Sequence, residues 1–396
     1  MKTVESPPPS LPHARRRWAR LSTLAFLLGL IAALLIVHAL PPAPPFSPQL
    51  GRATYWQSYE TSYFASVRAY EELLRSTLAA GNIPIVVFGD STLRGTGAVG
   101  ADVWTRLLEQ RLQTADPRVR VLNYSQNAGD LMGPFLFHHL QKKFPDAYYI
   151  NQWHFSSEVG VRHPFHYWLT AEIALRDGNA NPAVKHSFHI VPVKTPEERY
   201  AFVLAGANIA INYLDVGNWI RYRWMGRPFF DSDRKVKVQP LRDVAEADVT
   251  TTRFTPPAAA SAQTMREVFR ANVDAWVAYV KRPLAERAAY FAEMYPPALR
   301  SHMLLLTLDF NPYYAPRDEI KAMAWRTSWV QLRADMRQIS DLRWVSLAPS
   351  QGEMQQDDFS DLGHLTVHGQ QLLADAVADN LLSPGGWFGP KIAIAK

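Results

Sequence analysis

The stretch that most constrains the fold of this 396-residue chain covers residues 83–97, with the sequence IPIVVFGDSTLRGTG. An uninterrupted apolar run, Ile85–Phe88, stops at Gly89-Asp90-Ser91, and a glycine-rich polar stretch follows. A continuous apolar run is typical of a parallel strand buried on both faces. The carboxyl ends of such strands face the ligand-binding crevice of open α/β sheets. We therefore expect Ser91 to lie at the functional edge of a parallel sheet.

A serine hydroxyl becomes a useful nucleophile only when a base takes its proton. A candidate base and acid lie near the other end of the chain, in residues 358–370, DFSDLGHLTVHGQ. Asp361 and His364 are three residues apart, so one turn lets the carboxylate orient the imidazole while the imidazole faces another element. The helical pattern Gly369–Leu382 is expected to fix this turn against the sheet.

Other interpretations of these residues stay open. A serine after a strand is often only a helix N-cap, and Asp90 is expected to brace the turn. His368 is a rival base one helical turn after His364. Asp357 and Asp358 are rival acids.

Gly-Asp-Ser after the first strand and Asp-x-x-His before the last helix resemble the SGNH, or GDSL, hydrolase family. The Gly-x-Ser-x-Gly elbow of α/β-hydrolases is not present around Ser91. The resemblance implies a flavodoxin-like three-layer α/β sandwich with Ser91 as nucleophile, His364 as base and Asp361 as the orienting acid. It also implies an oxyanion hole built from the Ser91 N–H and a glycine after the second strand. Gly129 is the candidate, and Asn127 could contribute.

The third expected strand, Ala147–Gln152, departs from that family. Its usual Gly-x-Asn-Asp motif is replaced here by INQWHFSSE. Asn151 and Gln152 are the nearby amides able to supply the third oxyanion donor. A polar residue followed by Gln-Trp, together with an N-terminal anchor, resembles the D-alanine transfer proteins of the Dlt type. The resemblance implies a multi-spanning membrane O-acyltransferase as partner, and an envelope polysaccharide or lipid as acceptor of the acyl group.

The N-terminus predicts a membrane protein. Residues 21–40 carry no charged side chain, and twenty helical residues at about 1.5 Å each cover a hydrocarbon core of about 30 Å. Four arginines precede this segment, which predicts a cytoplasmic N-terminus and an extracytoplasmic, or periplasmic, domain. The expected organisation is a basic tail (1–20), an anchor (21–40), a Pro-rich spacer (41–54) and one SGNH-type domain (55–396). A cleaved signal peptide is the alternative.

Charge and composition exclude several classes of function. Residues 1–20 hold five Lys or Arg and one acidic residue, which leaves 37 basic and 35 acidic residues in the rest of the chain. This balance gives no reason to expect nucleic acid. The chain has no cysteine, so no disulfide is possible. The pairs His163/His166 and His186/His189 lack further ligands at metal-binding spacing, and neither metal nor cofactor is expected.

The remaining pattern predicts further strands at Val119–Tyr124, Met303–Leu308 and Trp344–Leu347, and a helical insertion at about 156–301. Expected helices are Tyr55–Leu78, Ala101–Leu112, Thr264–Tyr295 with an interruption near Pro283, and Arg317–Ile339. Within the insertion, a capping box at Thr195-Pro196-Glu197-Glu198 starts a helix that could run to Trp224. Its aromatic and arginine-bearing surface suits either a partner or the core. A surface loop is expected at Arg234–Ala262.

The sequence thus predicts a membrane-anchored, extracytoplasmic enzyme that forms an acyl-enzyme on Ser91. Water would resolve the acyl-enzyme by hydrolysis, and a polymer hydroxyl would resolve it by transfer; the same three residues serve both. The alternatives are a free carboxylesterase or deacetylase, and a non-catalytic envelope scaffold that binds a partner or glycan.

Overall fold

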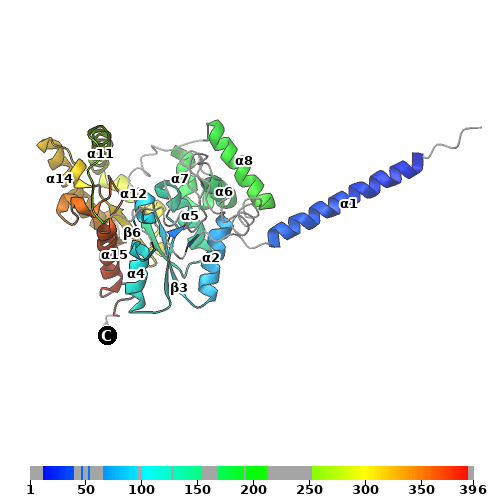
Figure 1. Ribbon diagram of the computed structural model, residues 1–396, viewed down its shortest axis with the longest axis horizontal. Coiled ribbons are helices and arrows are strands. Elements are labelled where there is room, and N and C mark those ends of the chain that lie inside the picture. The colour runs from blue at the N-terminus through cyan, green and yellow to red at the C-terminus, as the bar shows by residue number, and fades with distance from the viewer. Residues whose placement is uncertain are drawn as a thin grey trace, which may run out of the picture.

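The computed structural model of the protein describes residues 12–39, 46–47, 52–53, 66–96, 98, 100–125, 129–153, 168–190, 193–212, 252–339 and 341–390. A parallel sheet surrounded by helices forms the body, and the N-terminal helix α1 (Pro12–Ala39) extends away from it (Figure 1).

The sheet has five strands, and each neighbouring pair is parallel. Its strands are β3 (Ile83–Phe88), β4 (Val119–Asn123), β5 (Tyr148–Gln152), β6 (Met303–Leu308) and β7 (Arg343–Leu347), in the order β4-β3-β5-β6-β7. These are the five strands expected from the sequence, with ends shifted by at most two residues. The α/β class is therefore confirmed. Parallel strands end at one common edge, so the segments after β3, β4, β5 and β6 all begin there.

Helices cover both faces of the sheet, and each face has its own apolar core. Val86 and Phe88 of β3 pack in one core, and Ile85 and Val87 in the other, because successive side chains of a strand point to opposite faces. The first core takes residues of α2 (Val67–Ala79) and α5 (Gly129–Lys143). The second takes residues of α4 (Trp104–Gln113) and α15 (Val367–Leu382).

A helical insertion lies between β5 and β6, as the sequence predicts. Its helices are α6 (Trp168–Asp177), α7 (Pro182–Ile190), α8 (Pro196–Ile211), α11 (Ala259–Val280), α12 (Leu284–Met294) and α13 (Pro297–Arg300). The long helix α14 (Glu319–Ile339) connects β6 to β7. Shorter elements are α3 (Ser91–Arg94) and the 3-10 turns η1 (Gly100–Asp102), η4 (Gly178–Ala180), η6 (Pro312–Tyr314), η7 (Pro349–Gln351) and η8 (Gln356–Asp358).

Helix α8 begins as predicted and ends earlier. Its capping box is complete, with the Thr195 hydroxyl accepting from the Glu198 N–H and the Glu198 carboxylate accepting from the Thr195 N–H. The prediction that this helix runs to Trp224 is wrong, because Asn212 takes the left-handed conformation (φ 48°) that ends a helix. Tyr213–Trp224, and with them the aromatic, arginine-bearing part of the expected surface, lie outside the described residues.

Other expected boundaries also shift. Ala259–Ala262, expected in a loop, form the first turn of α11, and Pro283 separates α11 from α12 as predicted. Residues 46–47 of the expected polyproline spacer form strand β1 (Phe46–Ser47), which pairs antiparallel with β2 (Arg52–Ala53). Helix α2 begins at Val67 after the N-cap Ser66, and the earlier part of the helix expected from Tyr55 lies outside the described residues.

Helix α1 contains residues 21–39 of the expected membrane segment. Among the described residues, no helix combines the length and the apolar content needed to cross a membrane. The membrane anchor therefore stays a prediction.

A buried ionic network ties α2, α5 and α6 together on one face of the sheet. The His139 imidazole is only 1% exposed and lies between two carboxylates, 2.7 Å from Glu71 Oε1 and 2.9 Å from Asp177 Oδ1. Burial alone would raise the pKa of Glu71, but its bonds to His139 and Lys143 outweigh burial and lower that pKa to about 2. Burial lowers the pKa of His139, and its two carboxylate partners raise it above its usual value.

Candidate active site

Ser91 lies just after the carboxyl end of strand β3, at the first residue of the short helix α3. Asp90 is the N-cap of that helix, and its Oδ1 accepts from the Thr92 N–H at 2.8 Å. The structure thus gives Asp90 the bracing position that the sequence suggested. Gly89 is required by packing, since a Cβ at this position would lie 2.5 Å from Gln152 Oε1 and 2.7 Å from Leu93 Cδ1.

Asp361 and His364 lie on one tight turn between η8 and α15. Asp361 Oδ1 accepts from the backbone N–H groups of Gly363 (3.0 Å) and His364 (2.9 Å). The ends of the turn are joined by a bridge between Phe359 and Leu365. The Asp361 side chain thus shapes the turn that carries both Asp361 and His364. A spacing of three residues is therefore enough to bring the carboxylate to the imidazole.

The structure brings Ser91, His364 and Asp361 together although 273 positions separate Ser91 from His364. His364 Nε2 lies 2.7 Å from Ser91 Oγ, and His364 Nδ1 lies 2.7 Å from Asp361 Oδ2. Since ionised Asp361 is acceptor-only, Nδ1 carries the proton and Nε2 is left as the acceptor for the serine hydroxyl. This is the arrangement in which an imidazole can take the proton of an attacking serine.

The electrostatics of the turn favour a basic imidazole. Burial lowers the pKa of His364, but the hydrogen bond and charge of Asp361, with a further contribution from Asp90, outweigh it and raise that pKa above its usual value. Burial raises the pKa of Asp361, whereas His364 and two backbone N–H groups stabilise its carboxylate and bring that pKa below its usual value.

The three rival residues have other partners. His368 Nδ1 lies 2.5 Å from Asp358 Oδ1, and the His368 side chain is 65% exposed. Asp358 is buried and its second oxygen accepts from the Gln355 N–H. Asp357 faces Arg253 at 3.6 Å. The structure therefore does not bring any of the three rivals to Ser91.

The expected oxyanion donors differ in their placement. No hydrogen bond from the Ser91 backbone N–H is found among the described residues, as expected for the first residue of a helix, so this donor remains available to a ligand. Gly129 begins α5, just beyond the carboxyl end of β4, whereas Asn127 lies outside the described residues. The role of Gly129 stays a prediction.

The two amides of β5 point to opposite faces of the sheet. Gln152 reaches the serine turn, where its Oε1 accepts from the Asp90 N–H at 2.7 Å. Asn151 is fully buried, and its Nδ2 donates to the Tyr295 hydroxyl at 3.0 Å. Between the two, the structure thus brings Gln152 to the Ser91 turn and directs Asn151 elsewhere.

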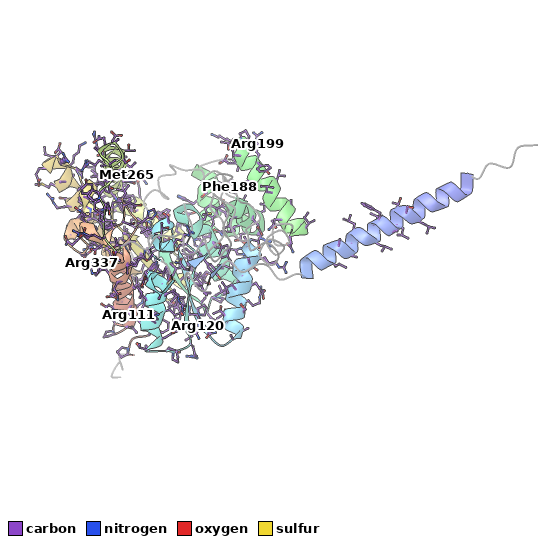
Figure 2. All side chains as sticks on the ribbon, viewed as in Figure 1. Arg111, Arg120, Phe188, Arg199, Met265 and Arg337 are labelled. Atoms are coloured by element: carbon purple, nitrogen blue, oxygen red, sulfur yellow. The ribbon has the colours of Figure 1, made fainter. Side chains whose placement is uncertain are left out.

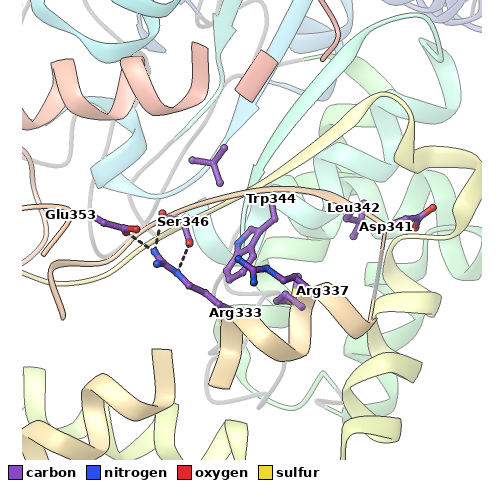
Figure 3. A pocket seen from close by; sticks show the side chains of 9 residues that line it. Arg333, Arg337, Asp341, Leu342, Trp344, Ser346 and Glu353 are labelled. Atoms are coloured by element: carbon purple, nitrogen blue, oxygen red, sulfur yellow. Dashed lines mark hydrogen bonds and ion pairs between the residues drawn. The ribbon is translucent and has the colours of Figure 1, made fainter. Parts of the chain in front are cut away.

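Two cavities of the described residues lie away from Ser91 and His364. One of about 520 Å³ is lined by Arg333, Arg337, Trp344 and their neighbours at the outer edge of β7, and a second of about 750 Å³ adjoins it. Arg333 there pairs with Glu353 and donates to Ser346 Oγ (Figure 3). A cavity is the usual first indication of a binding site, but these linings hold no nucleophile with an adjacent base. We therefore place the candidate site at Ser91.

Within the described ranges, no group of three or more His, Asp and Glu side chains is placed to hold a metal ion. His186 lies beside Glu293 at 3.9 Å, and the pair His163/His166 lies outside these ranges.

Comparison of the chain with models of known protein families and with curated proteins finds no match.

Proposed function

We propose that the protein is a serine acyltransferase or esterase that forms an acyl-enzyme on Ser91. The observation that carries this proposal is the continuous hydrogen-bonded chain from Ser91 Oγ through His364 to Asp361, at 2.7 Å for each step. In this mechanism Ser91 Oγ attacks an ester or thioester carbonyl carbon while His364 Nε2 takes the hydroxyl proton. His364 then returns that proton to the leaving oxygen or sulfur, and Asp361 stabilises the imidazolium that forms between the two steps.

The backbone around Ser91 supports the same chemistry. The carbonyl oxygen becomes negatively charged in the tetrahedral intermediate. Preorganised N–H donors stabilise this charge and so lower the activation barrier of the attack. The available N–H of Ser91 is one such donor, and the first N–H groups of α5 at Gly129 are the candidates for the second. Gln152 fixes the turn that presents Ser91.

The fold supports membership of the SGNH hydrolases. Counted along the chain from β3, the strand order is 2-1-3-4-5, which is the order of flavodoxin-like doubly wound sheets. Helices on both faces complete a three-layer sandwich, and the candidate residues follow the first strand and precede the last helix. These positions agree with the Gly-Asp-Ser and Asp-x-x-His motifs on which the resemblance rests.

The membrane attachment remains part of the proposal. Eight large apolar side chains of α1 between Leu21 and Leu35 are 46–70% exposed, and they stand out along a helix that extends from the body (Figure 2). Water is a poor environment for such a surface, so a bilayer is its natural surrounding. With the arginines before it in the cytoplasm, the α/β domain lies outside the cytoplasmic membrane.

Attachment favours acyl transfer over free hydrolysis. An enzyme that receives its acyl group from a membrane-embedded O-acyltransferase gains from being tethered, because a short link gives an effective concentration in the millimolar range. The acceptor in this proposal is a hydroxyl of an envelope polysaccharide or lipid, and D-alanine is one candidate acyl group. Soluble ester hydrolysis is the second candidate function, because the same three side chains serve both reactions.

Reaction of the full-length protein in detergent with a serine-directed fluorophosphonate tests the acyl-enzyme. Wild-type protein should label at one site, and Ser91→Ala and His364→Ala should abolish labelling while thermal unfolding stays unchanged. His368→Ala, which removes an equivalent imidazole paired with Asp358, is the matched control and should label at the wild-type rate. Labelling of Ser91→Ala at the wild-type rate would overturn the proposal and leave the scaffold alternative.

Fractionation and gene deletion test the location and the acceptor. The protein should stay with membranes in high salt and carbonate, and a reporter fused after Lys396 should be active only outside the cytoplasm. Deletion should lower ester-linked acyl groups in the envelope, and rescue should need both Ser91 and residues 21–40. Full rescue by a form lacking residues 1–40 would favour the free esterase.

A further inference from the structure

Asn311 lies three residues after the end of strand β6, in contact with the turn that carries Asp361 and His364. It follows Asp309 and Phe310 at the carboxyl edge of the sheet and is fully buried. The contacts of Asn311 indicate a structural role in the site.

Asn311 makes two hydrogen bonds to the backbone of the turn that carries Asp361. Its Nδ2 donates to the Asp361 carbonyl oxygen at 2.9 Å, and its backbone N–H donates to the Leu362 carbonyl oxygen at 2.9 Å. Its Oδ1 accepts from the Tyr313 N–H at 3.0 Å, which caps η6 and fixes the amide orientation. One residue thus holds two consecutive peptide units about 50 positions away in sequence, the first through its side chain and the second through its backbone N–H.

These two peptide units determine where the base lies. The Asp361 carboxylate accepts from the backbone of Gly363 and His364, so a shift of the Asp361 backbone moves both its own side chain and the imidazole. Apart from the contact of His364 with Ser91, the other hydrogen bonds of this turn among the described residues stay within it or join it to η8 and the start of α15. Asn311 is therefore the described residue whose hydrogen bonds join this turn to the end of β6, in the sheet that also carries Ser91.

We propose that Asn311 is a positioning residue that holds the Asp361–His364 turn in register with Ser91. The inference rests on the proposed function, because the reaction is the one assigned to Ser91 and His364. Asn311 does not touch the reacting atoms. It acts by fixing the distance between His364 Nε2 and Ser91 Oγ and by keeping Asp361 in place to raise the basicity of His364.

The test uses full-length Asn311→Ala and Asn311→Ser in detergent. The serine variant keeps an oxygen that can cap the Tyr313 N–H and loses the amide donor to Asp361. The matched control is Asn181→Ala. Asn181 is also buried, donates its Nδ2 to a backbone carbonyl (Phe135, 3.0 Å) and accepts from the N–H two residues on (Ala183, 3.1 Å), and its contacts lie in α5–α7.

Three quantities are measured for each protein: the thermal unfolding midpoint, the fluorophosphonate labelling rate against pH, and the titration of His364 by NMR, assigned by its loss in His364→Gln. We expect labelling of both Asn311 variants to be about 10- to 100-fold slower, since small misplacements of reacting groups have effects of this size. We also expect the His364 titration and the acidic limb of labelling to move to lower pH, because Asp361 then supports the imidazole less well. Asn181→Ala should lower the unfolding midpoint and leave the labelling rate and the His364 titration unchanged.

A wild-type His364 titration and labelling rate in folded Asn311→Ser would overturn the positioning role. Equal slowing in Asn181→Ala would also overturn it, by showing that general loss of stability is the cause. The NMR titration does not depend on reactivity. If wild-type protein fails to label at Ser91 while the titration still moves in the Asn311 variants, the proposed function fails and the positioning of His364 stands.

Discussion

Replacing Asp361 with asparagine tests the electrostatic core of the candidate site with little change in shape. The Oδ1 of Asp361 accepts two backbone N–H groups, and an asparagine carbonyl can keep both bonds. The Oδ2, which lies 2.7 Å from His364 Nδ1, becomes an NH₂ group that cannot accept the imidazole proton. The turn should therefore survive while the imidazole changes tautomer and carries its proton on Nε2, facing Ser91.

The loss is expected to be large. In the well-studied serine protease triad, the same substitution lowers turnover roughly 10⁴-fold, which corresponds to about 5.4 kcal/mol in the activation barrier. The loss here should approach that limit and stay below that of Ser91→Ala or His364→Ala, because a base is still present. The pKa of His364 should also fall, since burial lowers it and the hydrogen bond and charge of Asp361 are the main influences that raise it.

The assay is the fluorophosphonate labelling rate of full-length protein from pH 5 to 9, with thermal unfolding as the control for folding. The base must be neutral, so wild-type labelling should be lost as the pH falls through the raised pKa of His364. In Asp361→Asn the plateau should fall and the acidic limb should move to lower pH. If Asp361→Asn kept the wild-type plateau of the labelling rate and an unmoved acidic limb, the assignment of Asp361 as the orienting acid would be refuted. If Asp358→Asn also left labelling unchanged, His364 would be acting without an acid.

Two further predictions concern the framework of the site. Gly89→Ala should lower both stability and labelling, because its Cβ would lie 2.5 Å from Gln152 Oε1 and must displace the amide that holds the Asp90 N–H. The control is Gly352→Ala, where the positive φ of 78° makes alanine strained but the space is open, and it should leave labelling unchanged. Normal labelling in a stable Gly89→Ala protein would contradict the role of Gln152. The buried network predicts a pH-dependent stability: the pKa of Glu71 is lowered from 4.5 to about 2, so its contribution, on the order of 3 kcal/mol, is present above pH 4.5 and is lost as the pH falls toward 2. Denaturant unfolding of wild type and Glu71→Gln should therefore differ most near neutral pH and converge as the pH approaches 2. A gap that stays constant with pH would show that the carboxylate is not the cause.

The sequence by itself determined the strands and the identity of the candidate residues. Short, mainly apolar segments of four to six residues that end in polar or glycine-rich turns are local signals, and they located all five strands of the sheet within two residues. Ser91, Asp361 and His364 could be named because each motif is short and contiguous. Asp90 could be assigned a bracing position for the same reason, since N-capping acts over two residues.

Helix ends and linkers were less predictable, because they depend on backbone conformation at single residues. The pattern after Thr195 continues to favour a helix beyond residue 211, yet Asn212 in the left-handed conformation ends α8. Likewise, the proline-rich stretch after residue 41 predicted a spacer, and pairing with residues 52–53 makes part of it a strand.

Tertiary structure decided which side chains meet. The sequence favours His364 as the base and leaves His368 as a rival, and only the fold places the first against Ser91 and pairs the second with Asp358. Asn151 and Gln152 are neighbours, and the alternation of a strand between two cores sends one to Tyr295 and the other to the serine turn. The position of Asn311 beneath the Asp361 turn depends on where the end of β6 lies relative to a loop some 50 residues later. Contacts of this kind leave no periodic trace in the chain, because they arise from the shared edge of parallel strands that are far apart in sequence.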